Sequence, residues 1–189
     1  MSESRRPKSE NPRRIVVIGP PGGGKSTLAG QAARRLGCPH IEIDALFWAP
    51  GWVPRPKSAL REEIARQTAG DCWVADGIYS SVRDILWPRA DTLVWIDLSL
   101  AVVWWRLLWR SLRRGIAHEE LWPGCHETLR FRFWSRDSLF WAARRRLVRL
   151  RRTVPDLLRE APYAHLRLVR IRRPREAEDW VQSLGTDSR

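Results

Sequence analysis

The chain has 189 residues, which is the size of one domain with a hydrophobic core of its own. A hydrophobic fraction of 43% and 12 tryptophans exclude a disordered protein. The formal net charge is +13, from 34 basic against 21 acidic side chains, and an excess of this size attracts the phosphates of nucleotides and nucleic acids alike.

The first 12 residues are polar and basic and lack the apolar core of a signal peptide, so they predict a disordered tail in front of one domain over 13–186. The longest apolar stretch, 93–109, is interrupted by Asp97 and Arg106, which favours a strand and a helix over a membrane span. Three cysteines without metal-site spacing indicate a reducing, cytoplasmic setting and no disulfide framework.

A complete phosphate-binding loop, G-x-x-x-x-G-K-[ST], lies between a short apolar strand pattern and a helix pattern. Its residues are Gly19, Pro20, Pro21, Gly22, Gly23, Gly24, Lys25, Ser26 and Thr27. The glycines let successive backbone N–H groups surround an anion, and the helix N-terminus adds partial positive charge. In such a loop Lys25 reaches the β- and γ-phosphates and Ser26 binds Mg²⁺. The context predicts a nucleoside triphosphate site; a glycine-rich turn with a chance lysine is the alternative.

Apolar strands alternate with helical patterns along the rest of the chain. Strands are predicted at 14–18, 40–43, 72–75, 92–97 and 166–171. Helices are predicted at 25–36, 57–69, 80–87, 100–113, 127–152 and 175–184. This order predicts an α/β fold with a doubly wound parallel sheet of about five strands, in which ligands bind at the carboxyl ends of the strands.

Three carboxylates are predicted at such strand ends. Asp76 can hold a Mg²⁺-bound water beside Ser26, or it caps the helix that follows. Asp44 can orient or deprotonate an acceptor hydroxyl, or it caps a helix over an apolar patch. For Asp97, with Ser99 near the start of the next helix, capping is favoured over catalysis.

Aromatic and basic side chains near these acids form a candidate acceptor site. Trp48 is a candidate wall of the pocket, with core packing as the alternative. Arg83 can hold an acceptor anion through its planar guanidinium. Arg106 and Arg110 share one helix face at the start of a predicted lid over about 106–130. The lid would exclude water from the transferring phosphate, whereas the alternative is an exposed basic helix.

The chain resembles the P-loop kinases of the adenylate-kinase-like group and, more narrowly, the bacterial DNA topology modulation proteins. The resemblance covers nearly the whole chain after residue 12, and it rests on the phosphate loop, I-D-A-L-F-W and P-G-W within 43–52, W-V-A-D-G-I-Y at 73–79 and G-C-H-E at 124–127. It implies a kinase fold with a lid, binding of ATP and Mg²⁺, and Arg106 and Arg110 as paired arginines at the lid entrance. Adenylate kinases carry an AMP-recognition segment where this chain has 46–52, so AMP is not the expected acceptor.

Together these patterns predict ATP-dependent phosphoryl transfer to a small acceptor. The predicted catalytic residues are Lys25, Asp44, Asp76, Arg106 and Arg110; Ser26 and Asp76 are predicted to hold the metal, and Asp44, Trp48 and Arg83 the acceptor. One alternative is a nucleotide-regulated DNA-binding factor that uses the arginines of 130–152, and another is an ATP-binding protein without catalysis. Because no base-reading module is present, we expect any DNA binding to be independent of sequence and largely lost near physiological salt.

Overall fold

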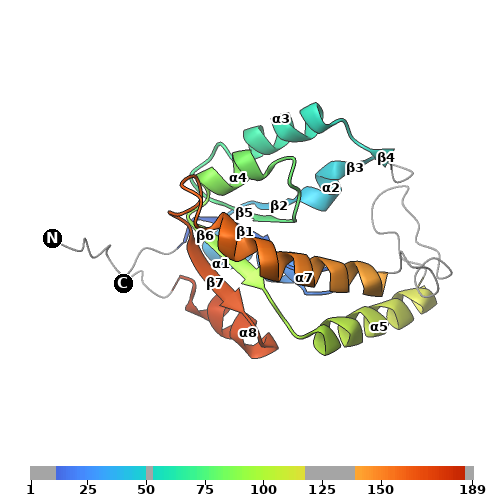
Figure 1. Cartoon of the computed structure of the whole chain (residues 1–189). Coiled ribbons are helices and arrows are strands. Elements are labelled where there is room, and N and C mark those ends of the chain that lie inside the picture. Colours follow the sequence, from blue (N-terminus) through green and yellow to red (C-terminus); the bar gives the residue numbers. More distant parts are fainter. Residues whose placement is uncertain (1–11, 50–52, 118–138, 186–189) are drawn as a thin grey trace.

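The computed structural model describes residues 12–49, 53–117 and 139–185. Its centre is a five-stranded sheet in the order β2-β5-β1-β6-β7, and every pairing is parallel. The strands are β1 (Arg14–Ile18), β2 (His40–Glu42), β5 (Trp73–Asp76), β6 (Thr92–Ile96) and β7 (Arg167–Ile171) (Figure 1). The predicted parallel sheet is thereby confirmed, with β1 and its phosphate loop at the centre of the sheet.

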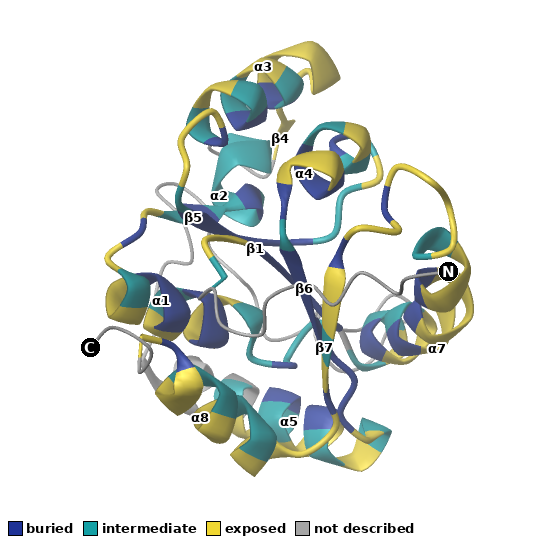
Figure 2. Cartoon of the chain, turned by 90° about the vertical axis from the view of Figure 1, so that its left-hand side faces the viewer, coloured by how far each residue is buried: buried dark blue, intermediate teal, exposed yellow. Residues whose placement is uncertain are grey.

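Helices cover both faces of the sheet. They are α1 (Lys25–Leu36), α3 (Lys57–Gln67), α4 (Arg83–Arg89), α5 (Leu100–Ala117), α7 (Leu139–Leu157) and α8 (Pro174–Ser183). In Figure 2, α3 and α4 lie on one side of the strands, and α1, α5 and α8 lie on the other. None of the described helices is both long enough and apolar enough to cross a bilayer.

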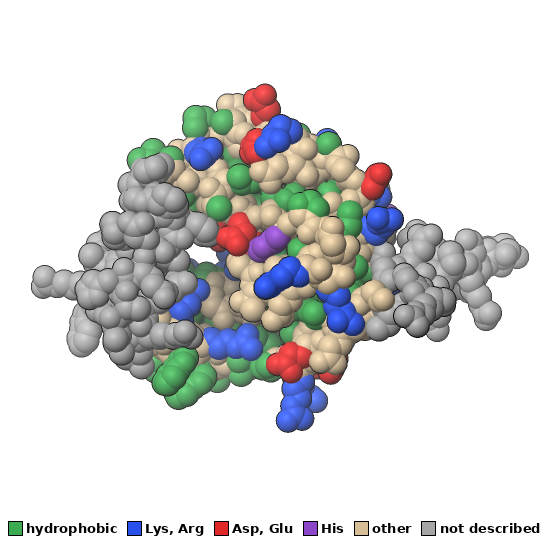
Figure 3. Space-filling model, turned by 180° about the vertical axis from the view of Figure 1, so that it is seen from behind, with side chains coloured by type: hydrophobic (Ala, Val, Ile, Leu, Met, Phe, Trp, Pro, Cys, Tyr) green, Lys and Arg blue, Asp and Glu red, His purple; other side chains and the backbone are tan. Residues whose placement is uncertain are grey.

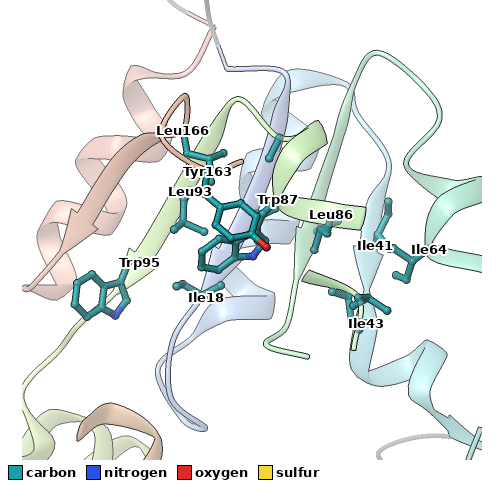
Figure 4. Close-up of a cluster of buried hydrophobic side chains, with 14 of the residues drawn as sticks. Ile18, Ile41, Ile43, Ile64, Leu86, Trp87, Leu93, Trp95, Tyr163 and Leu166 are labelled. Carbon is teal, nitrogen blue, oxygen red and sulfur yellow. The ribbon is translucent and has the colours of Figure 1, made fainter. Parts of the chain in front are cut away.

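The strands alternate their side chains between two apolar cores. Val16 and Ile18 of β1 pack with α3 and α4, while Ile15 and Val17 pack with α1 and α5. The core around α3 and α4 also buries Trp73 and Trp95 completely or nearly so. Figure 4 shows Trp95 with Trp87 and Tyr163 of the same core. Because both faces are covered, the central strands β1 and β6 are nearly continuous apolar runs, and the sequence pattern located them correctly.

The segment after β2 differs from the prediction. The strand ends at Glu42 rather than at Ile43, and a short helix α2 (Ile43–Phe47) follows, with Asp44 in its first turn. A small hairpin of β3 (Trp48–Ala49) and β4 (Val53–Pro54) comes next. The part of the predicted 127–152 helix before Leu139 lies outside the described residues, as do the tail at 1–11 and the lid segment at 118–130.

The expectation of no disulfide is wrong for two of the three cysteines. Cys38 follows the turn that ends α1, and Cys72 precedes β5; their Cα atoms are 5.4 Å apart and their sulfurs are bonded. Cys125 lies outside the described residues. The pair is 34 residues apart in sequence, so only the packing of α1 against β5 brings it together. Cysteine content therefore no longer supports a reducing compartment.

The favoured role of Asp97 as a helix cap is also wrong. Asp97 is 4% exposed, and its carboxylate accepts hydrogen bonds from Arg151 Nε at 2.7 Å and from Arg170 Nε at 3.0 Å. The cap of α5 is Ser99, whose hydroxyl accepts a hydrogen bond from the Val102 N–H at 3.4 Å. Asp97 thus joins the end of β6 to β7 and to α7.

Replacing Asp97 by asparagine should therefore destabilise the fold. We expect Asp97→Asn to lower the free energy of unfolding by about 2 kcal/mol, because two guanidinium groups lose a buried partner while keeping some access to water. Asp84→Asn is the matched control: its ion pair with Arg61 is exposed on both sides, so the loss should stay below about 1 kcal/mol. Urea unfolding of both variants measures the difference, and equal losses would contradict the role of Asp97.

Candidate active site

The phosphate loop joins the carboxyl end of β1 to the start of α1. Gly22 and Gly24 have φ angles of 74° and 92°, which disfavour any residue with a side chain. A Cβ on Gly22 would also lie 2.5 Å from Leu107 Cγ, so α5 packs directly on the loop. Gly23 N–H donates to Pro20 O at 3.1 Å and closes the turn. These features leave a concave backbone at the N-terminus of α1, as anion binding requires.

Lys25 supplies the cation of this loop. Its Nζ donates a hydrogen bond to Pro20 O at 3.3 Å. Burial lowers the pKa of its amine; Asp44 and Asp76 oppose that shift, and Arg110 and Arg146 add to it. A bound phosphate would favour the charged form and offset the effect of burial.

Ser26 and Asp76 form the pair that sequence reasoning assigned to the metal. Ser26 Oγ donates to Asp76 Oδ2 at 2.7 Å, and Asp76 is 2% exposed at the end of β5. Asp76 does not cap the next helix, because α4 begins after Val82. In the described part of the chain, no three His, Cys, Asp or Glu side chains are grouped to hold a metal alone. A hydroxyl and a carboxylate suit Mg²⁺, which usually binds through one or two protein oxygens together with substrate phosphates.

Asp44 lies beside a tyrosine that the sequence reasoning did not assign to the site. Tyr79 Oη donates to Asp44 Oδ1 at 2.6 Å. Burial, followed by the Asp44 carboxylate, raises the pKa of the Tyr79 phenol, so the hydroxyl remains a donor at neutral pH. The Phe47 ring lies 4.7 Å from the Tyr79 ring and 4.7 Å from the Trp48 ring, between ring centroids. Trp48 is therefore linked to Asp44 through an aromatic wall.

Three arginines reach the same region from two helices. Arg106 Nη1 donates to Gly23 O at 3.0 Å, and Arg110 lies close enough to Lys25 to lower the pKa of its amine. Arg146 of α7 acts on both Lys25 and Tyr79. The sequence reasoning did not single out Arg146, although the spacing of the inward-facing residues of α7, at 143, 147 and 150, places 146 on the same helix face.

Arg83 contacts two aromatic rings. Its guanidinium carbon is 5.9 Å from the ring centroids of both Trp87 and Tyr163, at the edge of the core around α3 and α4. Its assignment to the acceptor stays a prediction.

A cavity of about 320 Å³ lies between the phosphate loop and α8. It is lined by residues of the loop, of α1 and of α8, together with an arginine of α5: Thr27, Gln31, Leu98, Arg106, Pro174 and Glu178. Its walls combine apolar side chains with a planar guanidinium, which suits a flat heterocyclic ring.

The basic surface predicted over 130–152 is described from residue 140 onward. Arg144, Arg145, Arg149 and Arg152 are exposed, but Arg151 is paired with Asp97. Nucleic acid binding stays a prediction from net charge, since none of the described elements forms a base-reading module.

Known proteins resemble the chain in a short segment and in its overall fold. No protein-family model matches it. It is 56% identical over 34 residues to an adenylate kinase of Mycobacterium sp. (strain MCS), a match covering 18% of this chain and 19% of that one. A match of 53% identity over 34 residues, to an adenylate kinase of Streptomyces griseus, covers 18% of this chain and 94% of that sequence. The chain thus spans about a fifth of the length of the first of these relatives.

Solved structures match over almost the whole chain. A shikimate kinase from Bacteroides thetaiotaomicron has a TM-score of 0.53 at 17% identity and covers 90% of this chain and 95% of its own. A shikimate kinase from Acinetobacter baumannii in complex with shikimate has a TM-score of 0.54 at 16% identity, covering 90% and 89%. A gluconokinase from Sinorhizobium meliloti 1021 has a TM-score of 0.50 at 22% identity, covering 92% and 94%.

The chain has the fold of the P-loop kinases. The phosphate loop, the parallel sheet and the matches above agree on this point. The narrower resemblance to DNA topology modulation proteins stays a prediction.

The lowered pKa of Lys25 can be measured by chemical labelling. We expect the Lys25 amine to react with acetic anhydride at a lower pH than an ordinary lysine, because burial favours its neutral, nucleophilic form. The exposed Lys57 at the start of α3 is the internal reference, and mass spectrometry of the labelled peptides measures both. Mg-ATP should protect Lys25 and leave Lys57 unchanged. Equal pH midpoints for the two lysines would contradict the assignment.

Proposed function

We propose that the protein transfers the γ-phosphoryl group of ATP to a hydroxyl group of a small acceptor. The observation that carries this proposal is the Ser26–Asp76 hydrogen bond of 2.7 Å at the end of the phosphate loop. It brings a hydroxyl and a carboxylate oxygen, both suited to Mg²⁺, close to the Lys25 amine. The Asp44 carboxylate is also close enough to raise the pKa of that amine. A cradle for phosphates, a place for the metal and a carboxylate for the acceptor therefore lie close together around Lys25.

The residues present fit a magnesium ion. Ser26 Oγ and, through water, Asp76 would hold Mg²⁺, which neutralises charge on the β- and γ-phosphate oxygens. The Lys25 ammonium binds the same phosphates, and the backbone N–H groups of the loop orient them. The triphosphate is thereby fixed with its terminal phosphorus toward the carboxyl ends of the strands, where Asp44 lies.

Asp44 fits the role of acceptor base. Tyr79 Oη donates to Oδ1, so Oδ2 can accept the hydrogen bond of an acceptor hydroxyl. As the acceptor oxygen bonds to the γ-phosphorus, its proton passes to Asp44 and the bond from phosphorus to the β,γ-bridging oxygen breaks, which releases ADP. Phe47 and Trp48 then form one wall of the acceptor pocket.

The arginines supply positive charge where negative charge develops. Arg110 and Arg146 lie close enough to Lys25 to act on its amine, and Arg106 donates a hydrogen bond to the loop at Gly23 O. Guanidinium groups held in place before the reaction stabilise the transferring phosphoryl group without reorganising during it. The same charge favours an acceptor that carries an anionic group.

The cavity next to α8 fits the nucleoside end of ATP. It adjoins Gly23 and Gly24, and Arg106 lines it with a flat cationic surface on which a base can stack. Glu178 at its rim offers an acceptor for an amino group of the base.

The similar structures support a hydroxylated small molecule as the acceptor. Shikimate kinase and gluconokinase are both named for such compounds, and each covers nine-tenths or more of this chain. Their low identity leaves the acceptor of this chain open, so a panel of sugars, hydroxy acids, nucleosides and nucleotides is the starting point.

Two substitutions test the assignment, once a screen for acceptor-dependent ATP consumption has identified an acceptor. Lys25→Ala and Asp76→Asn should each lower kcat/KM by on the order of 100-fold. The first removes a cation that binds the transferring phosphate, and the second weakens the magnesium site. Asp84→Asn, an exposed carboxylate on α4, is the matched control and should keep wild-type kinetics. Wild-type rates for Asp76→Asn, or absence of triphosphate binding by the wild type, would overturn the proposal.

A further inference from the structure

His40 contacts the carboxylate on which the proposed metal site depends. It is the first residue of β2, and its Nε2 lies 2.9 Å from Asp76 Oδ1. Asp76 is 2% exposed, and the His40 side chain is 20% exposed. An ionised carboxylate accepts hydrogen bonds and cannot donate them, so Nε2 carries the hydrogen. Through this bond, β2 contacts the Asp76 carboxylate, which is the one assigned to the proposed metal site.

The two oxygens of Asp76 have different partners. Oδ1 accepts from His40, and Oδ2 accepts from Ser26 at 2.7 Å. A carboxylate held at both oxygens cannot rotate about its terminal torsion. Since Oδ1 faces β2, Oδ2 faces the phosphate loop.

The register of the sheet explains why position 40 reaches Asp76. In the parallel pairing of β2 with β5, Glu42 stands opposite Asp76 and His40 stands opposite Val74. Residues 40 and 42 point to the same face of the strand, because side chains alternate along it. The imidazole thus lies between two carboxylates, with His40 Nδ1 3.8 Å from Glu42 Oε1. Figure 3 shows a histidine against acidic side chains on the rear face of the molecule.

The pKa of the neighbouring Glu42 reports on the electrostatic surroundings of these carboxylates. Burial raises the pKa of the Glu42 carboxyl, the charge of Asp76 raises it further, and His40 opposes both. Two acidic groups stand opposite each other in the sheet, and the imidazole between them holds the Asp76 carboxylate together with Ser26.

We propose that His40 is a positioning residue that holds Asp76 in the rotamer required for magnesium–triphosphate binding. The inference rests on the proposed function, since it assigns His40 to the metal side of that site. His40 contacts neither the nucleotide nor the metal and acts through Asp76. Partners of this kind, one bond removed from a metal, commonly change metal affinity by about 10- to 100-fold when they are lost.

Two polar variants of His40 test whether the hydrogen bond to Asp76 matters, rather than only the presence of a polar side chain. In His40→Gln, the side-chain amide nitrogen can take the place of Nε2 and still donate to Asp76; in His40→Asn, the shorter side chain cannot. Both remain polar, and circular dichroism checks that both fold. His165→Ala is the control. It removes a histidine whose Nε2 lies 3.0 Å from Ala90 O, a contact that involves neither the phosphate loop nor Asp76.

The readout is the Mg²⁺ dependence of ATP binding, measured by titration calorimetry at a series of Mg²⁺ concentrations. We expect His40→Asn to need about tenfold more Mg²⁺ than the wild type for its half-maximal effect, while its affinity for ATP without Mg²⁺ changes by less than about twofold. His40→Gln and His165→Ala should stay within about twofold of the wild type.

Three outcomes count against the inference, and they are distinguishable. An unchanged Mg²⁺ midpoint in His40→Asn overturns the role of His40 while Mg-ATP binding by the wild type stands. Equal losses of ATP affinity with and without Mg²⁺ show that His40 supports the fold and not the metal site. If the wild type binds no Mg-ATP at all, the proposed function falls and the inference falls with it.

Discussion

The hydrogen bond between Ser26 and Asp76 joins the two elements on which the site depends. Ser26 lies in the first turn of α1, and Asp76 ends β5. These elements lie side by side because β5 is the neighbour of β1 in the sheet, and α1 packs against both strands. The parallel arrangement brings the carboxyl ends of the strands to one edge, so the phosphate loop and the carboxylate meet there without any long connecting segment.

The balance of charge around this bond explains what the pocket can bind. Lys25, Arg110 and Arg146 bring three cationic groups near the carboxylates of Asp44 and Asp76, and Arg106 is bonded to the phosphate loop at Gly23 O. The lowered pKa of the Lys25 amine shows that the carboxylates do not fully offset burial and the neighbouring guanidinium groups. Under the proposed function, a polyanion with a divalent cation would complete this balance, whereas an apolar ligand would leave these charges without partners.

The sequence predicted those parts of the site that depend on local pattern. The phosphate loop, β1 and α1 have the bounds expected from apolar runs, glycines and the Gly37 stop. Asp76 was placed correctly because an apolar run ends there before a glycine. Arg106 and Arg110 followed from their spacing of four residues on one helix.

The remaining parts depend on contacts between distant segments, which no local pattern encodes. Asp97 pairs with arginines 54 and 73 residues away, and Tyr79 meets Asp44 across 35 residues. The Cys38–Cys72 bond and the His40–Asp76 bond likewise require strands and helices to be in their final order. The short α2 and the β3–β4 hairpin were missed because elements of two to five residues have too little periodicity to be recognised.

The most direct measurement is a crystal structure of the protein with Mg²⁺ and a non-hydrolysable ATP analogue. The account predicts the β- and γ-phosphates within the loop of residues 19–27, the Lys25 amine on both, and Mg²⁺ on Ser26 Oγ with a coordinated water on Asp76. It also predicts the base in the cavity beside Arg106. A metal held by other residues, or an analogue bound away from this loop, would contradict the account.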